Sequence, residues 1–392
     1  MSTTPFQEVE SALASGGIES ALDVLAEKLR SNGEYHELFE ARKLGLRHRL
    51  GLPLLYDQSG DMTDEQQRQL EEGLIEACRE SGLLLIEKGK IRESWAYLRP
   101  IGENSLVAGR LRQIPVNDEN MEELIEVLLY EGVDPSRGFQ LILEHYGTCN
   151  AITTYEGQMY QKDVRTQQKA AEMILRRVHG ELIENVIGHI SREEDEPPAG
   201  GSLGQLLQGR EWITADGNYH VDTSHLASTV RISRVLEGSR NLELSLDLTD
   251  YGRRLDPSLQ YPGEEPFTDV YASHGHYFEA LLGRDVPAAV DYFRQRAEQV
   301  DVRAEGTVAV EVLIQLLARI GRYREAIDAT LELIPEGVQT VGLAPSLLEL
   351  SSKAGHYQPM LDACQRRDDL LGYAACLATR ATQDTAKEKA VP

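Results

Sequence analysis

The spacing of apolar residues predicts helices along most of the chain. From residue 6 to about residue 113, apolar positions recur at the intervals that place them on one face of a helix. One such stripe contains Ile18, Ala21, Leu22, Leu25 and Leu29. Gly16-Gly17 precedes this stripe, and Asn32-Gly33 ends it with residues that suit a left-handed helix cap. The pattern therefore predicts helical hairpins in the N-terminal part.

The apolar pattern changes in the middle of the chain. Two helices are expected between 117 and 143, around Glu131-Gly132-Val133-Asp134-Pro135, and one long helix over 164–190. An acidic, Pro-Pro and Gly-Gly stretch from Glu193 to Gly201 then predicts a linker. The chain is thus divided into N-terminal helical hairpins (1–115), central helices (116–192), a linker and irregular insertion (193–270), C-terminal repeats (271–378) and a disordered tail (379–392).

A repeated turn gives the clearest sign of architecture. The segment from Gly321 to Ile327 recurs from Gly355 to Leu361, 34 residues later, and the segment from Gly89 to Trp95 has the same order of residue types. A glycine, a large apolar residue two positions on and a small residue five positions on resemble the turn of tetratricopeptide repeats. Gly321, Tyr323 and Ala326 match that turn best. The likeness implies stacked helical pairs.

The expected fold is therefore all-α, a tetratricopeptide-like α-hairpin solenoid with an irregular central insertion. A short β-hairpin is expected in that insertion, because Asp216-Gly217-Asn218 is a turn signal. Its flanking strand residues would be Trp212, Ile213, Tyr219 and Val221.

Composition narrows the functions that remain. The 392 residues include 64 Asp and Glu against 40 Lys and Arg, a formal charge of −24. Such a surface repels phosphate backbones and anionic membranes, so no nucleic-acid or membrane partner is expected. It favours a partner with basic groups. Four scattered cysteines without a CxxC pair and an N-terminus without a leader pattern predict a cytoplasmic protein.

The segment from Glu144 to Ile152 is the first candidate for chemistry. Gly147 would end one helix and Thr148 would cap the next, which places Cys149 where helix N–H groups favour a thiolate. His145 would be its base, with Asn150 beside it. The alternative is structural: a small cysteine fits a tight corner between helices. We favour the alternative, because no third orienting group is identifiable.

The second candidate combines histidines with a carboxylate. His220, Asp222 and His225 lie within six residues, and mixed ligands of this kind suit zinc or iron. His274 and His276 form a His-x-His pair that would diverge on a helix. The spacing matches no standard metal signature, and a capping network by Asp222 is the competing interpretation. No cofactor is predicted, with a divalent metal such as zinc as the alternative.

Two arginines follow these residues. Arg231 and Arg234 share a helix face and would bind an anion or a carboxylate. In so acidic a chain, pairing with Glu or Asp of the protein is the default expectation. The remaining histidines are expected at exposed or turn positions: His36, His48, His179, His189 and His356.

No phosphate-binding loop, nucleophile elbow or HExxH motif occurs in the sequence. We therefore expect a scaffold or adaptor, rather than an enzyme, that binds a protein or peptide through a concave acidic surface. The alternative is an enzyme, or a metal or small-ligand binder, with its site in the central His- and Cys-rich insertion. The sequence does not indicate an oligomeric state.

Overall fold

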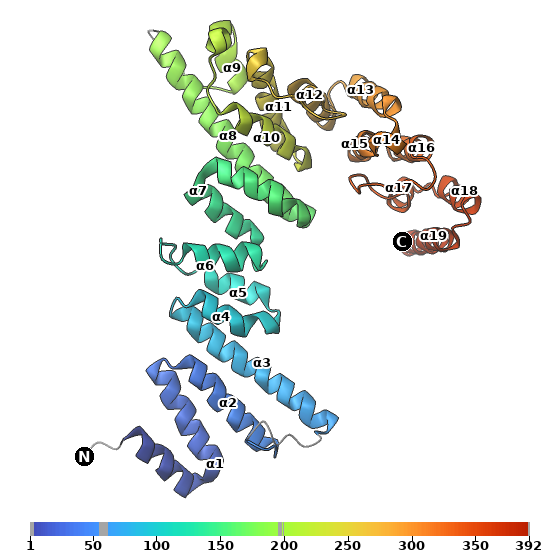
Figure 1. The fold of residues 1–392 in the computed structure, drawn as a ribbon. Helices are drawn as coiled ribbons and strands as arrows, with labels where there is room; N and C mark the ends of the chain where they lie inside the picture. Colours follow the sequence, from blue (N-terminus) through green and yellow to red (C-terminus); the bar gives the residue numbers. More distant parts are fainter. Residues whose placement is uncertain (1–3, 55–61, 195–197, 199, 391–392) are drawn as a thin grey trace. The chain divides into compact units, whose positions relative to one another are not determined.

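The computed structural model describes residues 4–54, 62–194, 198 and 200–390, and they contain helices but no strands (Figure 1). The chain forms two compact units, residues 1–147 and residues 148–392. The all-α prediction is confirmed. None of the described helices has both the length and the apolar character needed to cross a membrane.

The first unit consists of consecutive helices that pack against their neighbours in the chain, α1 on α2, α2 on α3 and α3 on α4. A hydrophobic cluster around Tyr35, Leu38 and Leu85 joins them. The elements are α1 (Pro5–Asn32), α2 (Tyr35–Arg49), α3 (Asp64–Glu87), α4 (Ile91–Leu98), the 3-10 turn η2 (Arg99–Ile101), α5 (Asn104–Leu111), α6 (Met121–Ile125), the π-helical turn η3 (Glu126–Tyr130) and the start of α7 (Pro135–Gln158).

Glycine shapes both ends of this unit. Gly17 has φ 77° and ψ −169°, which interrupts α1 at the place where the sequence predicted a helix start. Gly147 has φ 80° and ψ −179°, which interrupts α7 at the boundary between the units. Both backbone conformations are essentially restricted to glycine. The predicted helix end at Gly147 is therefore confirmed.

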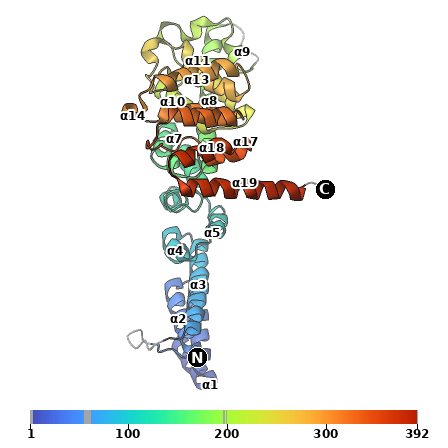
Figure 2. The same ribbon diagram turned by 90° about the vertical axis from the view of Figure 1, so that its right-hand side faces the viewer.

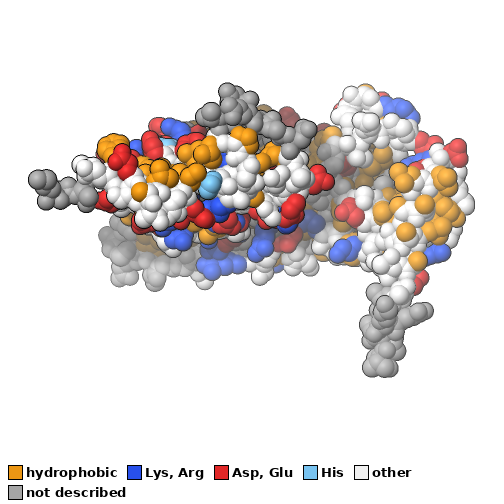
Figure 3. All heavy atoms as spheres, turned by 90° about the horizontal axis from the view of Figure 1, so that it is seen from below, with side chains coloured by type: hydrophobic (Ala, Val, Ile, Leu, Met, Phe, Trp, Pro, Cys, Tyr) orange, Lys and Arg blue, Asp and Glu red, His pale blue; other side chains and the backbone are white. Residues whose placement is uncertain are grey.

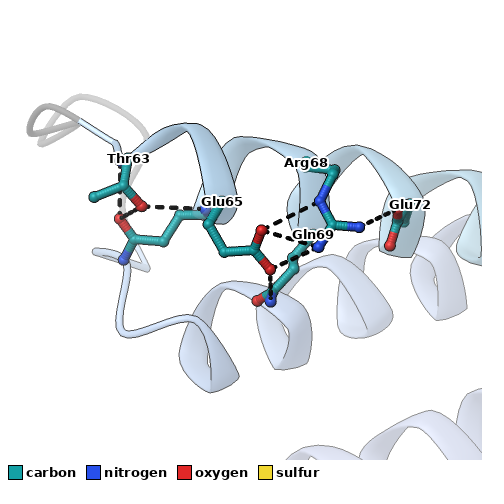
Figure 4. A network of polar contacts seen from close by, with 6 residues as sticks. Thr63, Glu65, Arg68, Gln69 and Glu72 are labelled. Carbon is teal, nitrogen blue, oxygen red and sulfur yellow. Dashed lines mark hydrogen bonds and ion pairs between the residues drawn. The ribbon is translucent and has the colours of Figure 1, made fainter.

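The exposed helix faces carry local hydrogen bonds and ion pairs, as the start of α3 shows in Figure 4. Thr63 and Gln66 form a capping box, in which each side chain accepts a hydrogen bond from the backbone N–H of the other residue. Arg68 lies between Glu65, at 2.7 Å, and Glu72, at 3.0 Å. Pairs so exposed add little to stability and mainly keep the surface polar.

The second unit begins with residues 148–158 of α7, and its long helix α8 packs against α10 and α11 (Figures 1 and 2). Its remaining helices again contact their neighbours in the chain. The elements are η4 (Met159–Gln161), α8 (Val164–Glu193), α9 (Leu203–Leu207), η5 (Glu211–Gly217), α10 (Thr223–Ile232), η6 (Ser233–Val235), α11 (Ser239–Arg254), η7 (Pro257–Leu259), α12 (Val270–Leu281), α13 (Val286–Gln299), α14 (Val302–Glu305), α15 (Val308–Arg319), α16 (Tyr323–Leu333), α17 (Leu347–Ala354), α18 (Gln358–Arg366) and α19 (Leu370–Ala390).

Three expectations for this unit need correction. The predicted β-hairpin is wrong, because residues 211–217 form the 3-10 turn η5 and Tyr219 follows in irregular backbone. Residues 203–207, 223–232 and 239–254 are helical, so the insertion is more regular than expected. Helix α19 continues through Ala390, so the segment from Thr379 is helical rather than disordered. Residues 195–197 and 199 of the predicted linker lie outside the described residues.

One turn geometry recurs six times among the described residues of the two units, each time between consecutive helices. The N–H of a glycine with positive φ donates to the carbonyl of the residue three positions earlier. The N–H of the residue after the glycine donates to the carbonyl five positions before itself. This is the Schellman arrangement, which satisfies the last carbonyls of a helix. The glycines are Gly33, Gly51, Gly89, Gly283, Gly321 and Gly355.

The residues after these turns are also alike. Five positions after the glycine lies a buried residue in four of the turns: Leu38, Ser94, Ala326 and Met360. Two positions after it lies a large side chain: Tyr35, Ile91, Tyr323 and Tyr357. The order of residue types seen in the sequence thus corresponds to a recurring local structure.

A buried carboxylate fastens the loop between α16 and α17. Glu311 on α15 is fully buried, and its two oxygens accept from the N–H groups of Val341 and Leu343, each at 2.7 Å. Ala344 N–H at 3.4 Å and the Thr307 hydroxyl at 2.5 Å complete the set. Only donors surround this carboxylate among the described contacts. Glu311 therefore holds the loop to α15.

Candidate functional site

The main candidate site is a cavity of about 510 Å³ in the second unit. We call it the relay pocket. One wall is a face of α8, and the other is the segment that joins η5 to α10. Its lining residues are Glu184, Asn185, Gly188, His189, Arg192, Asn218, Tyr219, His220, Val221 and Asp222.

The local sequence explains why these residues meet. Asn185, His189 and Arg192 are four and three positions apart on α8, so they share one face of that helix. On the opposite wall, Asp216 and Gly217 both have positive φ and turn the chain before residue 218. Asn185 then fixes this wall to α8, because its amide donates to the carbonyl of His220 at 2.8 Å.

A chain of hydrogen bonds leads from the protein interior to the pocket. The Tyr251 hydroxyl, on α11, lies 2.9 Å from both the backbone nitrogen and the Nδ1 atom of His220. The Nε2 atom of His220 lies 2.7 Å from Nδ1 of His189. Tyr251 is fully buried, whereas His189 is half-buried at the pocket wall. We call these three residues the relay.

The direction of the relay follows from hydrogen-bond counting. The backbone N–H of His220 donates to the Tyr251 oxygen. The Tyr251 O–H then needs an acceptor, because a buried donor without a partner costs about 1–3 kcal/mol. Nδ1 of His220 is within reach, so it accepts, and the His220 proton lies on Nε2. Nε2–H donates to Nδ1 of His189, which leaves the His189 proton on Nε2.

The surroundings keep His220 uncharged. Burial, together with the nearby His189 and Arg192, lowers the pKa of His220 from 6.5 to about 4. Burial likewise raises the pKa of the Tyr251 hydroxyl, so this group stays protonated. The His189 ring stacks on His220, with 4.9 Å between centroids, and meets the edge of Trp212 at 5.1 Å. At neutral pH His220 and Tyr251 are therefore uncharged within an aligned set of donors and acceptors.

The predicted ligands His220, Asp222 and His225 do not form a metal site. Both ring nitrogens of His220 belong to the relay. Asp222 caps α10, where its Oδ1 accepts from the N–H groups of Ser224 at 2.9 Å and His225 at 3.1 Å. Within the part of the chain that the structure describes, no three His, Cys, Asp or Glu side chains are placed to hold a metal ion. The competing interpretation, a cap by Asp222, is the one observed.

The His-x-His pair on α12 also diverges. His274 is fully buried, with Nδ1 2.5 Å from the Val270 carbonyl and its ring stacked on Phe267 at 4.2 Å. Burial, with Arg234 nearby, lowers the pKa of His274 to about 3. His276 faces Tyr292, 5.2 Å away between ring centroids. Because the two rings leave the helix in different directions, they share no ligand.

The arginine pair differs from the default expectation. Arg231 donates to the Ser228 hydroxyl at 2.9 Å, and Arg234 Nε donates to the Arg231 carbonyl at 3.1 Å. The Arg234 guanidinium also lies over the Phe267 ring, 4.8 Å from its centroid. Neither arginine has a carboxylate within ion-pair distance among the residues described. The expected pairing with Glu or Asp is therefore wrong.

The three members of the cysteine candidate lie on either side of Gly147. His145 lies before Gly147 in the first unit, and Cys149 and Asn150 follow it in the second. All three side chains are exposed. The described contact of Cys149 is within its own helix, where its carbonyl accepts from the Thr153 hydroxyl at 3.1 Å. Gly147 interrupts the helix as expected, but Cys149 is exposed rather than packed in a tight corner between helices.

A second hollow, of about 480 Å³, lies in the first unit between α1, α2 and α3. Glu80 in its wall accepts from Arg42 at 2.8 Å and also pairs with Arg30. These opposite charges compensate one another within the protein. This hollow is therefore a weaker candidate for ligand binding than the relay pocket, because these charged groups already have partners within the protein.

Sequence reasoning found His220 and Asp222 but missed the rest of the site. His189 is half-buried in the relay and His179 is buried 3.0 Å from Asp247, so the prediction that both are exposed was wrong. The spacing of Asn185, His189 and Arg192 along the long helix was the available signal. Comparison of the chain with protein families, curated proteins and solved structures gives no match. The functional argument therefore depends on this geometry.

Proposed function

We propose that the protein is a helical-repeat scaffold that binds a protein or peptide partner carrying basic groups. The observation that carries the proposal is the recurring Schellman turn, with its large residue two positions on and its buried residue five positions on. Repeated helical pairs of this kind stack into extended surfaces that bind other chains. A tetratricopeptide-like solenoid with a concave acidic surface is the arrangement that we propose.

Charge supports the choice of partner. The formal charge of −24 favours association with basic groups and slows association with acidic ones. On the face drawn in Figure 3, basic side chains lie among the acidic ones, so the acidic excess there is not a single uniform patch. Recognition would then depend on the pattern of charge as well as on its sum. The four free cysteines are in keeping with a cytoplasmic location, which belongs to the same proposal.

Peptide binding tests the scaffold proposal. The probes are fluorescent peptides of about ten residues that differ only in charge: lysine-rich, serine-rich and glutamate-rich. Anisotropy should rise with the lysine-rich peptide alone, and the affinity should fall when ionic strength is raised from about 0.15 M to about 1 M. Equal binding of all three peptides, or none with the lysine-rich peptide, would contradict the proposal.

A second candidate function is the binding of a small ligand in the relay pocket. The relay is the observation that favours it, because a buried tyrosine and a buried neutral histidine fix the orientation of a half-buried histidine at a cavity wall. Prepositioned polar groups of this kind are typical of ligand sites. A structural network would not require an open cavity at its end.

A further inference from the structure

We propose that the relay pocket binds a small amino carboxylate, a molecule of amino-acid or short-peptide size with one carboxylate and one ammonium group. The proposal rests on the second candidate function and names its ligand. Two independent features carry it: a donor of fixed direction beside an arginine at one end of the pocket, and carboxylates elsewhere on its walls.

The donor end follows from the direction of the relay. The His189 proton lies on Nε2, because His189 Nδ1 accepts from His220. Within the described residues, His189 Nε2 has no hydrogen-bond partner and Arg192 has no carboxylate within ion-pair distance. A histidine N–H and a guanidinium are both hydrogen-bond donors, and the guanidinium is positively charged, so a negatively charged acceptor complements them. A carboxylate meets both requirements.

Carboxylates lie on both walls of the relay pocket. Glu184 is eight positions before Arg192 on α8, so about 12 Å separates them along the helix axis at about 1.5 Å per residue. On the other wall, hydrogen bonds from the Ser224 side chain and the His225 backbone lower the pKa of Asp222, which keeps it ionised. Its Oδ1 atom carries the cap, and no described contact involves Oδ2. A ligand ammonium would balance these charges.

The cavity limits the size of the ligand. A volume of about 510 Å³ lies within the range of roughly 300–1,000 Å³ that small-molecule sites have. Because charged and amide side chains dominate the lining, an apolar molecule would leave them without partners. A simple anion would satisfy Arg192 and His189 but would leave Glu184 and Asp222 without a cation. A molecule with separated charges satisfies both sets.

The test uses glycylglycine as the probe, measured by isothermal titration calorimetry with the full chain. Two analogues each remove one charge: N-acetylglycylglycine lacks the ammonium, and glycylglycinamide lacks the carboxylate. We expect saturable binding of glycylglycine and a loss of about tenfold or more in affinity for each analogue. Equal binding of either analogue would overturn the proposal.

Variants locate the binding. R192A and H189F should each weaken glycylglycine binding by about tenfold or more. R176A is the matched control, because Arg176 lies on the same helix, pairs with Glu172 at 2.6 Å and does not line the pocket. It should bind like the wild type. If R192A binds like R176A, the ligand lies elsewhere and the proposal fails.

Failure of the ligand class is distinguishable from failure of the pocket. If acetate binds and R192A abolishes that binding while glycylglycine does not bind, the amino carboxylate proposal is overturned and the second candidate function stands. If neither probe binds, the amino carboxylate proposal is likewise overturned. Neither result bears on the peptide assay, which tests the scaffold separately.

Discussion

Removal of one hydroxyl group should weaken the second unit measurably. In Y251F the backbone N–H and the Nδ1 atom of His220 both lose the partner that now lies 2.9 Å from each. A buried polar group without a partner costs about 1–3 kcal/mol. Because the neighbouring cavity gives water some access, we expect a total of about 2–4 kcal/mol rather than the full sum.

The fold supplies a matched control for this substitution. Tyr271 on α12 is also fully buried, but its hydroxyl has no hydrogen-bond partner among the described residues. Y271F removes the same atom without removing a hydrogen bond, so the free energy of unfolding should change by less than about 0.5 kcal/mol or rise. The difference between the two variants isolates the hydrogen bonds of the relay.

Tryptophan fluorescence can report on the second unit alone. The chain has two tryptophans, Trp95 in the first unit and Trp212 beside His189 in the second. In a W95F background, urea unfolding followed by the emission of Trp212 gives the stability of the region around the relay. A thermal melt should show a fall of roughly 4–16 °C for Y251F, from about 2–4 °C per kcal/mol. Equal effects of Y251F and Y271F would refute the reasoning.

Three further predictions follow from buried or strained positions. E311Q should lower the free energy of unfolding by about 2–4 kcal/mol, because its amide group would face backbone N–H donors; urea titration measures this loss. The pKa of His220 is 6.5 in the unfolded chain and about 4 in the folded one, so the free energy of unfolding should decline as pH falls from 6.5 to 4 and level off below pH 4. Thermal melts across this pH range measure the decline, and a flat profile would contradict the prediction. G147A should lower the free energy of unfolding by about 1–3 kcal/mol, because Gly147 has a positive φ. G180A should raise it by about 0.5–1 kcal/mol, because a Cβ at this position of α8 meets open space; thermal melts of the two variants compare them.

The helices were predictable because their signals are local. Apolar spacing identified the long helix α8 to within a few residues, and the glycine turns at Gly89, Gly321 and Gly355 appear where the sequence placed them. The hairpin around Asp216-Gly217 failed for a physical reason. A turn signal fixes only a local change of direction, and the residues before it curl into η5 instead of pairing with those after it.

The relay was only partly predictable, because its members come from distant parts of the sequence. His220 stood out in a dense polar segment, but no sequence motif singled out Tyr251, and His189 was expected at an exposed or turn position. Tyr251 instead lies inside α11, where packing against α8 brings it to His220. Tertiary packing determines which polar side chains contact one another, and these contacts cannot be predicted from the local sequence pattern.

The position of the imidazole protons tests the central claim most directly, that the relay presents a donor to the pocket. Nitrogen-15 NMR of histidine-labelled protein at neutral pH distinguishes protonated from unprotonated ring nitrogens. We expect both His220 and His189 to carry their proton on Nε2, with Nδ1 unprotonated, and we expect Y251F to disturb this pattern at His220. A proton on Nδ1 of either histidine at neutral pH would contradict it.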